Sequence, residues 1–257
     1  MVRLQKVMGS GRDNTIVLIP AYNESRTIGD VVLGITKTGM RVLVIDDGST
    51  DNTEQAALDN GAMVIGHSRN LGKGFSVRDG IRHVLEKNDF EWIIMMDGDG
   101  QHHPEDIPVL MDATQAEETD IVIGNRMLRT ETMPFLRYWT NRFMSRVISG
   151  ICALHIPDTQ CGYRLIRVSA LKRMKLTSKK FDIESEMLIR AAASSMKIIS
   201  VPIQTIYGGE TSMIKPMRDT IRFCALILKY CFNLDGLRRS EKADGGRTSD
   251  PPRDQRS

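Results

Sequence analysis

The first half of the chain alternates short apolar runs with amphipathic segments. The runs are rich in β-branched residues and apolar without interruption, which is typical of strands buried on both faces of a parallel sheet. They occupy residues 16–19, 42–45, 62–65, 92–96 and 121–123. Strands that alternate with helical segments predict an α/β fold with a mostly parallel sheet and helices on both of its faces.

Turn and capping residues mark the helices expected between these strands. Ser25 is a candidate N-cap for a helix that ends near Gly39, and Asp51 has the capping-box spacing to Glu54. Pro104 stands where a proline in the first turn of a helix is expected. Further helices are expected at residues 134–148, 184–193 and 221–232, and extended segments at 163–167 and 197–206.

Two carboxylates follow the apolar run at residues 92–96. Asp97 and Asp99 are two positions apart, and side chains with this spacing point the same way on an extended chain. Two hard oxygen ligands at a sheet edge suit a Mg²⁺ or Mn²⁺ ion whose other ligands come from a diphosphate. The alternative is a solvated acidic turn, because Asp-Gly pairs are frequent in turns. The position directly after a buried strand favours the metal.

Polar residues also follow the first two apolar runs. Asp46 and Asp47 end the second run, and Pro20, Tyr22 and Glu24 follow the first. In an open α/β sheet, ligands bind beyond the carboxyl ends of the strands. Taken alone, Asp46 and Asp47 are better explained as a turn with a helix cap, and residues 20–24 are a weak signal, so neither group identifies a site by itself.

Composition narrows the class of protein. The 257 residues, 41% hydrophobic and 26% charged, suit one sizeable globular domain. A net charge of +3, with basic residues spread along the chain, gives no support for a nucleic-acid partner. The four cysteines form no zinc-like spacing, which favours reduced thiols in a cytoplasmic protein. There is no signal-peptide pattern, and no apolar run approaches the about 20 residues that span a bilayer.

We expect three regions: a flexible N-terminus at residues 1–13, one folded domain at 14–235, and a disordered tail at 236–257. The apolar helix expected at 221–232 is too short to cross a membrane. Burial in the core or in a homodimer contact is the favoured reading. The alternative is peripheral contact of residues 219–239 with the inner face of a membrane, where basic side chains meet anionic lipid.

The strand ends together resemble those of nucleotide-sugar transferases with the GT-A fold. The similarity is to the large inverting family, glycosyltransferase family 2, that includes dolichol-phosphate mannose synthase. It extends over roughly residues 14–232 and is carried by motifs in the same order and spacing. These motifs are residues 20–24, 46–51, 70–74, 97–102, 124–126, 158–164 and 181–186.

The resemblance implies roles for the matching residues. The base and ribose of the nucleotide-sugar donor would be bound by Pro20, Tyr22, Glu24, Asp46 and Asp47. The donor diphosphate would meet Lys73, and Lys215 in a lid expected at residues 208–216. The metal would be held by Asp97, Asp99 and Gln101. An acceptor phosphate would be held by Arg126, Arg142 and Ser145. Asp97, Asp99, Arg126 and Arg142 would be the catalytic residues.

The chemical nature of the acceptor stays open between two classes. A hydroxyl acceptor needs a general base, for which Glu184 and Glu186 are candidates. A lipid phosphate needs none, because its second pKa is about 6. Guanidinium groups suit phosphate, and four arginines lie in the acceptor half of the chain: Arg126, Arg142, Arg146 and Arg164. We therefore favour transfer from a GDP-mannose or UDP-glucose type of donor to a polyprenyl phosphate.

Two functions outside this class share only the α/β core. A nucleotide-sugar pyrophosphorylase is expected to carry a glycine-rich loop with a basic residue after its first strand, whereas residues 20–24 read Pro-Ala-Tyr-Asn-Glu here. A non-catalytic nucleotide-sugar-binding module would bind the donor without turnover.

Overall fold

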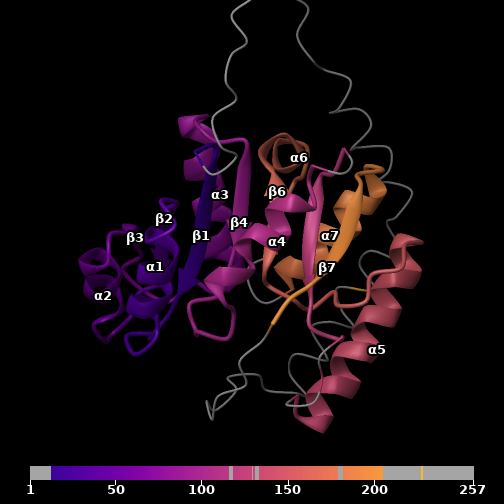
Figure 1. The fold of residues 1–257 in the computed structure, drawn as a ribbon, viewed down its shortest axis with the longest axis horizontal. Helices are drawn as coiled ribbons and strands as arrows, with labels where there is room; N and C mark the ends of the chain where they lie inside the picture. The colour runs from indigo at the N-terminus through magenta and orange to yellow at the C-terminus, as the bar shows by residue number, and fades with distance from the viewer. Residues whose placement is uncertain are drawn as a thin grey trace, which may run out of the picture.

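The computed structural model of the protein describes residues 13–115, 118–128, 130, 133–178, 182–204 and 227. In this part of the chain one sheet has the strand order β3-β2-β1-β4-β6-β5-β7 (Figure 1). The strands are β1 (Thr15–Ala21), β2 (Arg41–Asp46), β3 (Met63–Gly66), β4 (Trp92–Met95), β5 (Ile121–Asn125), β6 (Arg164–Arg167) and β7 (Ile198–Pro202). Only β6 runs antiparallel to its neighbours, β4 and β5. The prediction of a mostly parallel sheet is confirmed.

The central strands form the core of the molecule. Every residue of β4 and β5 is buried, as are all but one residue of β1 and of β2. Uninterrupted apolar sequence fits these positions because helices cover both faces of the sheet. In the register, Ala21 pairs with Asp46 and Leu18 with Met95. The loops after β1, β2 and β4 therefore leave the sheet at the same edge.

Helices pack on both faces of the sheet (Figure 1). They are α1 (Ile28–Thr36), α2 (Thr53–Asp59), α3 (Lys73–Lys87), α4 (Ile107–Asp112), α5 (Phe135–Cys152), α6 (Val168–Lys172) and α7 (Ile183–Ala193), with a short 3₁₀ turn, η1 (Pro104–Asp106), before α4. Helix α1 packs against α2 and η1, whereas α3 packs on β1, β2 and α6. Right-handed crossovers place α3 on the face opposite α1 and α2. Helix α5 lies along the outer edge of the molecule and packs against α7.

Some sequence-based boundaries need correction. Ser25 does not cap α1, which begins at Ile28 with Thr27 at the N-cap. The backbone N–H of Ser25 instead donates to Asp51 Oδ2 at 3.3 Å. Asp51 is likewise not the N-cap of α2, where Asn52 stands without a side-chain cap. Both residues are used to join two loops, which a local capping pattern does not anticipate.

Several predictions fall on residues that the structure does not describe. They are the boundaries of the N-terminal and C-terminal regions at residues 1–12 and 236–257, the lid at 208–216 with Lys215, and the segment at 219–239 apart from Ile227. Within the described residues, no helix combines the length and apolar character needed to cross a membrane.

Candidate active site

The loops after β1 and β2 are joined by hydrogen bonds at the carboxyl edge of the sheet. The Asn23 N–H donates to Ser49 Oγ at 2.9 Å, and Thr50 N–H donates to Asn23 Oδ1 at 2.9 Å. Asn23 takes a left-handed conformation with φ 56°, which asparagine tolerates better than most residues. The Thr27 hydroxyl donates to Gly98 O at 2.7 Å and so joins the loop after β4 to the same group. Three loops distant in sequence thus form one rigid rim.

Asp46 and Asp47 are both buried and serve this rim. Asp46 Oδ1 accepts from the Ser49 N–H at 3.1 Å. Asp47 accepts from the backbone N–H groups of Leu71 at 2.9 Å and Gly72 at 2.7 Å. Asp47 therefore fixes the loop that precedes α3. Their predicted contacts with the donor stay predictions.

Gly48, between these loops, has no room for a side chain. Its φ is +72°, and an added Cβ would lie 2.4 Å from the carbonyl carbon of Arg69. Only glycine allows the loop after β2 to approach the chain before α3 this closely.

Lys73, the first residue of α3, lies between two carboxylates. Its Nζ is 2.6 Å from Asp97 Oδ1 and 2.7 Å from Glu184 Oε1. Burial alone lowers the pKa of Lys73, but the charges of Asp97 and Glu184 outweigh it and raise the pKa. Burial alone raises the pKa of Asp97, and the Lys73 ammonium more than reverses this, to about 2. The Lys73 side chain therefore stays protonated and the Asp97 carboxyl stays ionised at neutral pH.

The second oxygen of Asp97 depends on a glycine. A Cβ added at Gly162 would lie 2.7 Å from Asp97 Oδ2. Gly162 directly precedes Tyr163 and β6, so the antiparallel strand comes close to the carboxylate without covering it. The Asp97 side chain keeps 28% of its surface exposed.

The structure fits a metal shared with a ligand rather than one enclosed by protein. Asp97 carries a carboxylate that already contacts a cation, the Lys73 ammonium. Asp99 Oδ1 accepts from the Gln101 N–H at 3.0 Å, and Gln101 Oε1 accepts from Arg137 at 3.2 Å. Among the described residues, no group of three or more His, Cys, Asp or Glu is arranged to hold a metal ion. Asp97 and Asp99 follow β4 two positions apart, and carboxylates of this kind suit Mg²⁺ or Mn²⁺ when a diphosphate supplies the other oxygens.

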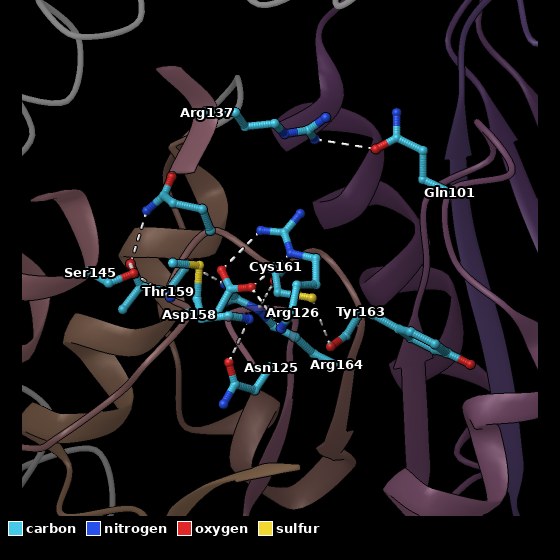
Figure 2. Close-up of polar contacts among 12 residues, drawn as sticks. Gln101, Asn125, Arg126, Arg137, Ser145, Asp158, Thr159, Cys161, Tyr163 and Arg164 are labelled. Carbon is cyan, nitrogen blue, oxygen red and sulfur yellow. Dashed lines mark hydrogen bonds and ion pairs between the residues drawn. The ribbon is translucent and has the colours of Figure 1, made fainter. Parts of the chain in front are cut away.

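A second buried ion pair lies where an acceptor phosphate is predicted to bind (Figure 2). Arg126 Nε and Nη2 donate to the two oxygens of Asp158 at 2.7 and 2.9 Å, and the Arg126 backbone N–H adds a bond of 3.1 Å. Asp158 is fully buried and Arg126 is 5% exposed. A bidentate pair of this kind fixes the guanidinium orientation. Contact of Arg126 with an acceptor phosphate stays a prediction.

Arg164 does not belong to a phosphate-binding cluster, contrary to the prediction. It is fully buried, and its guanidinium donates to three carbonyls, those of Cys161 at 2.8 Å, Thr159 at 2.8 Å and Glu184 at 2.6 Å. Arg164 thus holds the segment before β6 against the start of α7. Its position is visible among the labelled side chains of Figure 2.

The two candidate bases on α7 differ sharply in surroundings. Glu186 is fully buried and accepts bonds from the Thr177 N–H, the Ser178 N–H and Arg190 Nε, the last at 2.9 Å. Glu184 uses Oε1 for Lys73, while its buried Oε2 has no hydrogen-bond partner among the described residues. The oxygens of Glu186 are therefore used for hydrogen bonds within the fold. Of these two glutamates, only Glu184 keeps an oxygen that could bind a ligand.

His102 is a second buried group with an unused polar atom. Its ring stacks on Tyr163 with centroids 5.0 Å apart, and its Nδ1 finds no partner in the described part of the chain. Burial lowers the pKa of His102 to about 4, although Asp97 opposes the shift. The imidazole is therefore neutral at pH 7.

The remaining predicted residues differ in their exposure to solvent. Ser145 on α5 is buried, and its Oγ accepts from the Thr159 N–H at 2.9 Å. Arg142 on the same helix is exposed, and its Nη1 donates to the Tyr138 hydroxyl at 3.2 Å. Pro20 and Tyr22 are half-buried beside the rim. Glu24 is also half-buried, and its backbone N–H donates to Thr53 Oγ1 at 2.8 Å.

Sequence reasoning missed one residue that shapes the site, His67. The residue precedes the 70–74 motif and carried no local pattern, because its partners are distant along the chain. Its Nδ1 lies 3.0 Å from Asp47 Oδ1, and its Nε2 lies 3.2 Å from Asp79 Oδ2. His67 therefore joins the loop after β2 to α3.

Comparison with known proteins gives consistent results. The profile of Glycosyl transferase family 2 matches residues 16–175. Glycosyltransferase AglJ of Haloferax volcanii is 35% identical over 213 residues, which cover 80% of this chain and 68% of that protein. The undecaprenyl-phosphate mannosyltransferase of Micrococcus luteus is 30% identical over 217 residues, which cover 77% of this chain and 86% of the relative.

A solved structure supports the fold. Glucosyl-3-phosphoglycerate synthase from Mycobacterium tuberculosis, crystallised with Mn²⁺, uridine diphosphate and phosphoglyceric acid, has a TM-score of 0.64 to this chain at 16% identity. The match covers 86% of this chain and 78% of the synthase. At this identity the likeness concerns the fold, and it confirms the expected GT-A architecture.

The ion pairs of His67 predict a pH-dependent stability. Burial acts to lower the pKa of His67, but hydrogen bonds and charges of Asp47 and Asp79 outweigh it and raise the pKa. The folded pKa therefore exceeds the unfolded value of about 6.5. The imidazolium stabilises the fold fully below pH 6.5, and this contribution is lost as the pH rises through the folded pKa.

Urea unfolding from about pH 6 to about pH 9 measures this contribution. The free energy of unfolding of the unmodified chain is expected to fall over this range more steeply than that of His67→Gln. The exposed His155 provides the control, and His155→Gln should keep the original pH dependence. Equal slopes for His67→Gln and the unmodified chain would contradict the assignment.

Proposed function

Because the chain belongs to glycosyl transferase family 2 and is a glycosyltransferase, we propose that it moves a sugar from a nucleotide-diphosphate sugar to a polyprenyl phosphate. The configuration at the anomeric carbon is inverted. The observation that supports binding of the donor at this site is the pairing of Lys73 Nζ with Asp97 Oδ1 at 2.6 Å. It places an ammonium and a carboxylate together where the loops after β1, β2 and β4 meet.

Asp97 and Asp99 would hold a divalent cation, with Gln101 beside them. When bound, Mg²⁺ or Mn²⁺ neutralises the charge that develops on the departing diphosphate. Support comes from the paired carboxylates at the strand end and from the structural neighbour, which was crystallised with Mn²⁺ and uridine diphosphate. Lys73 provides a second cation at the same edge, and its raised pKa keeps the ammonium protonated.

The transfer consists of one displacement. An oxygen of the acceptor phosphate attacks the anomeric carbon from the side opposite the nucleotide, and the bond from that carbon to the diphosphate oxygen breaks. The electron pair leaves with the nucleoside diphosphate, where Lys73 is positioned to meet the charge. No proton has to leave the acceptor, because a phosphate monoester is largely dianionic at pH 7.

The proposal that the acceptor is a phosphate is based on the side chains of α5 and α7. Glu186 is excluded as a general base because its oxygens are buried and hydrogen-bonded. Helix α5 carries the exposed Arg142 and places Arg137 3.2 Å from Gln101. Guanidinium groups beside residues 97–102 suit an anionic acceptor. The name of the Micrococcus luteus relative, an undecaprenyl-phosphate mannosyltransferase, points to the same acceptor class.

Transfer to a hydroxyl acceptor is the second candidate function, and one observation favours it. Glu184 Oε2 is buried and has no partner among the described residues, so it is available to accept a proton or a hydrogen bond. The other oxygen, Oε1, lies 2.7 Å from the Lys73 ammonium and is engaged in that ion pair. We therefore rank a base role for Glu184 below a role in binding.

The central test is release of nucleoside diphosphate with Mn²⁺ and a panel of donors that includes GDP-mannose and UDP-glucose. We expect release from one donor class to depend on a short-chain polyprenyl phosphate. Chelation should lower the rate at least about a hundredfold, and Mg²⁺ or Mn²⁺ should restore it. Release that is equally fast without the lipid would exclude the acceptor, and full activity after chelation would exclude the metal.

Replacement of Glu184 distinguishes the two acceptor classes. With the lipid phosphate, Glu184→Gln should keep transfer within about tenfold of the unmodified rate, since no proton needs to be removed. A required base would cost at least about a hundredfold. The exposed Glu91 gives the matched control Glu91→Gln, for which no change is expected. Circular dichroism should accompany each measurement to show that the variants are folded.

Replacement of Lys73 tests its role toward the diphosphate. Lys73→Met should lower kcat/KM for the donor by about a hundredfold, the size expected for loss of one preorganised cationic donor. Lys87 ends the same helix and is exposed, so Lys87→Met is the matched control and should leave kcat/KM unchanged. Equal values for Lys73→Met and Lys87→Met would show that Lys73 does not act on the donor.

A further inference from the structure

Helix α5 presents large apolar side chains to solvent. Their exposed fractions are 78% for Phe135, 65% for Leu136, 51% for Trp139 and 62% for Phe143. Elsewhere in the described chain, exposed large hydrophobics such as Leu58 and Val109 occur singly on separate helices. Scattered apolar residues of that kind need no explanation, whereas a contiguous group marks an interaction surface.

The exposed group lies on one side of the helix. At about 100° per residue, Phe135, Trp139 and Phe143 follow one another along a single stripe, with Leu136 beside them. The core-facing side is the opposite one and consists of Asn141, Ser145, Ile148 and Cys152. The helix is therefore more aromatic toward solvent than toward the core, the reverse of an ordinary surface helix. Phe135 and Trp139 touch, with ring centroids 6.1 Å apart.

The charge of α5 indicates what covers this stripe. The helix carries three arginines, Arg137, Arg142 and Arg146, and no acidic residue. Arg142 and Arg146 are exposed. A twofold dimer through this face would bring the arginines of two copies together without an acid on the helix to compensate. Aromatic side chains flanked by arginine suit the interface of an anionic bilayer, where the rings enter the headgroup region.

The position of α5 connects this face to the site. Arg137 donates to Gln101 at 3.2 Å, and Ser145 accepts from the Thr159 N–H at 2.9 Å, next to the Arg126–Asp158 pair (Figure 2). The helix also lies along the outer edge of the molecule (Figure 1). A surface that contacts the stripe would therefore lie beside the acceptor side of the sheet.

We propose that the α5 stripe, Phe135, Leu136, Trp139 and Phe143, docks on the surface of an anionic lipid bilayer. The proposal rests on the proposed function for its purpose, because a polyprenyl phosphate is held in a membrane with its phosphate at the surface. Docking through α5 brings Arg142 and the adjoining site to that phosphate. The stripe is separate from residues 219–239, for which membrane contact was considered from sequence.

Sedimentation of the full chain with vesicles that contain no polyprenyl phosphate tests the docking alone. Binding is expected to vesicles of equal parts phosphatidylglycerol and phosphatidylcholine, and to weaken at about 0.5 M NaCl, where charges are screened. Leu136→Ser/Phe143→Ser should lower the partition coefficient at least about tenfold. The matched control is Leu33→Ser/Leu58→Ser, which removes exposed leucines of 37% and 45% from α1 and α2 and should bind normally.

Tryptophan fluorescence localises the contact. The chain has two tryptophans, of which Trp92 is 7% exposed and Trp139 is 51% exposed. A shift of the emission to shorter wavelength with anionic vesicles, together with quenching by brominated lipid, is expected from Trp139. The same signals should be absent from Trp139→Phe, whose remaining tryptophan is in β4.

Three results would overturn the proposal: unchanged binding by the folded stripe variant, loss of binding by the leucine control as well, or a dimer in solution that the stripe substitutions dissociate. Transfer to a short, water-soluble polyprenyl phosphate without vesicles is measured in parallel. If that transfer occurs and vesicle binding does not, the docking is wrong and the proposed function stands. If vesicles bind through the stripe but no lipid phosphate is glycosylated, the acceptor is wrong instead.

Discussion

The Lys73 ammonium joins three parts of the described chain through charge. Lys73 is the first residue of α3, Asp97 follows β4, and Glu184 lies in the first turn of α7. Separated from Lys73, Asp97 and Glu184 would be two neighbouring negative charges in partly buried positions. Loss of one partner from such a pair leaves an uncompensated charge, which is typically worth about 3–5 kcal/mol. The geometry of the candidate site therefore depends on one cation.

The position of Lys73 is itself set by a second carboxylate. Asp47 receives the backbone N–H groups of Leu71 and Gly72, the two residues directly before Lys73. His67 then links Asp47 to Asp79, which lies six residues after Lys73 in α3. Asp47, at the end of β2, thus helps to set the position of the Lys73 ammonium beside Asp97, although it does not contact that ammonium through these bonds. A substitution of His67 or Asp79 would therefore be felt at Lys73, because buried polar networks respond as units.

Sequence reasoning could predict the sheet and the edge that carries the site, because both depend on local patterns. Apolar runs identified the five strands of the first half, and carboxylates at their ends marked Asp46 and Asp97. Contacts between distant residues were out of reach. Glu184 and Glu186 are equivalent in sequence, yet one faces Lys73 and the other accepts donors from Thr177, Ser178 and Arg190. Their difference arises from packing around α7, which no local pattern encodes.

The same limit explains the arginines. Four guanidinium groups in the acceptor half form one class by composition, but burial divides them. Arg164 satisfies three carbonyls and Arg126 is bound to Asp158, whereas Arg142 and Arg146 remain at the surface of α5. Buried guanidinium groups cost free energy unless each donor finds a partner, so the first two stabilise the walls of the site. The exposed pair is placed to meet an anion outside the protein, and it shares its helix with the aromatic stripe. Helix α5 thus presents both the exposed arginines and the exposed aromatic side chains. Its Arg137 contacts Gln101, close in sequence to Asp97 and Asp99, the carboxylates that would hold the metal.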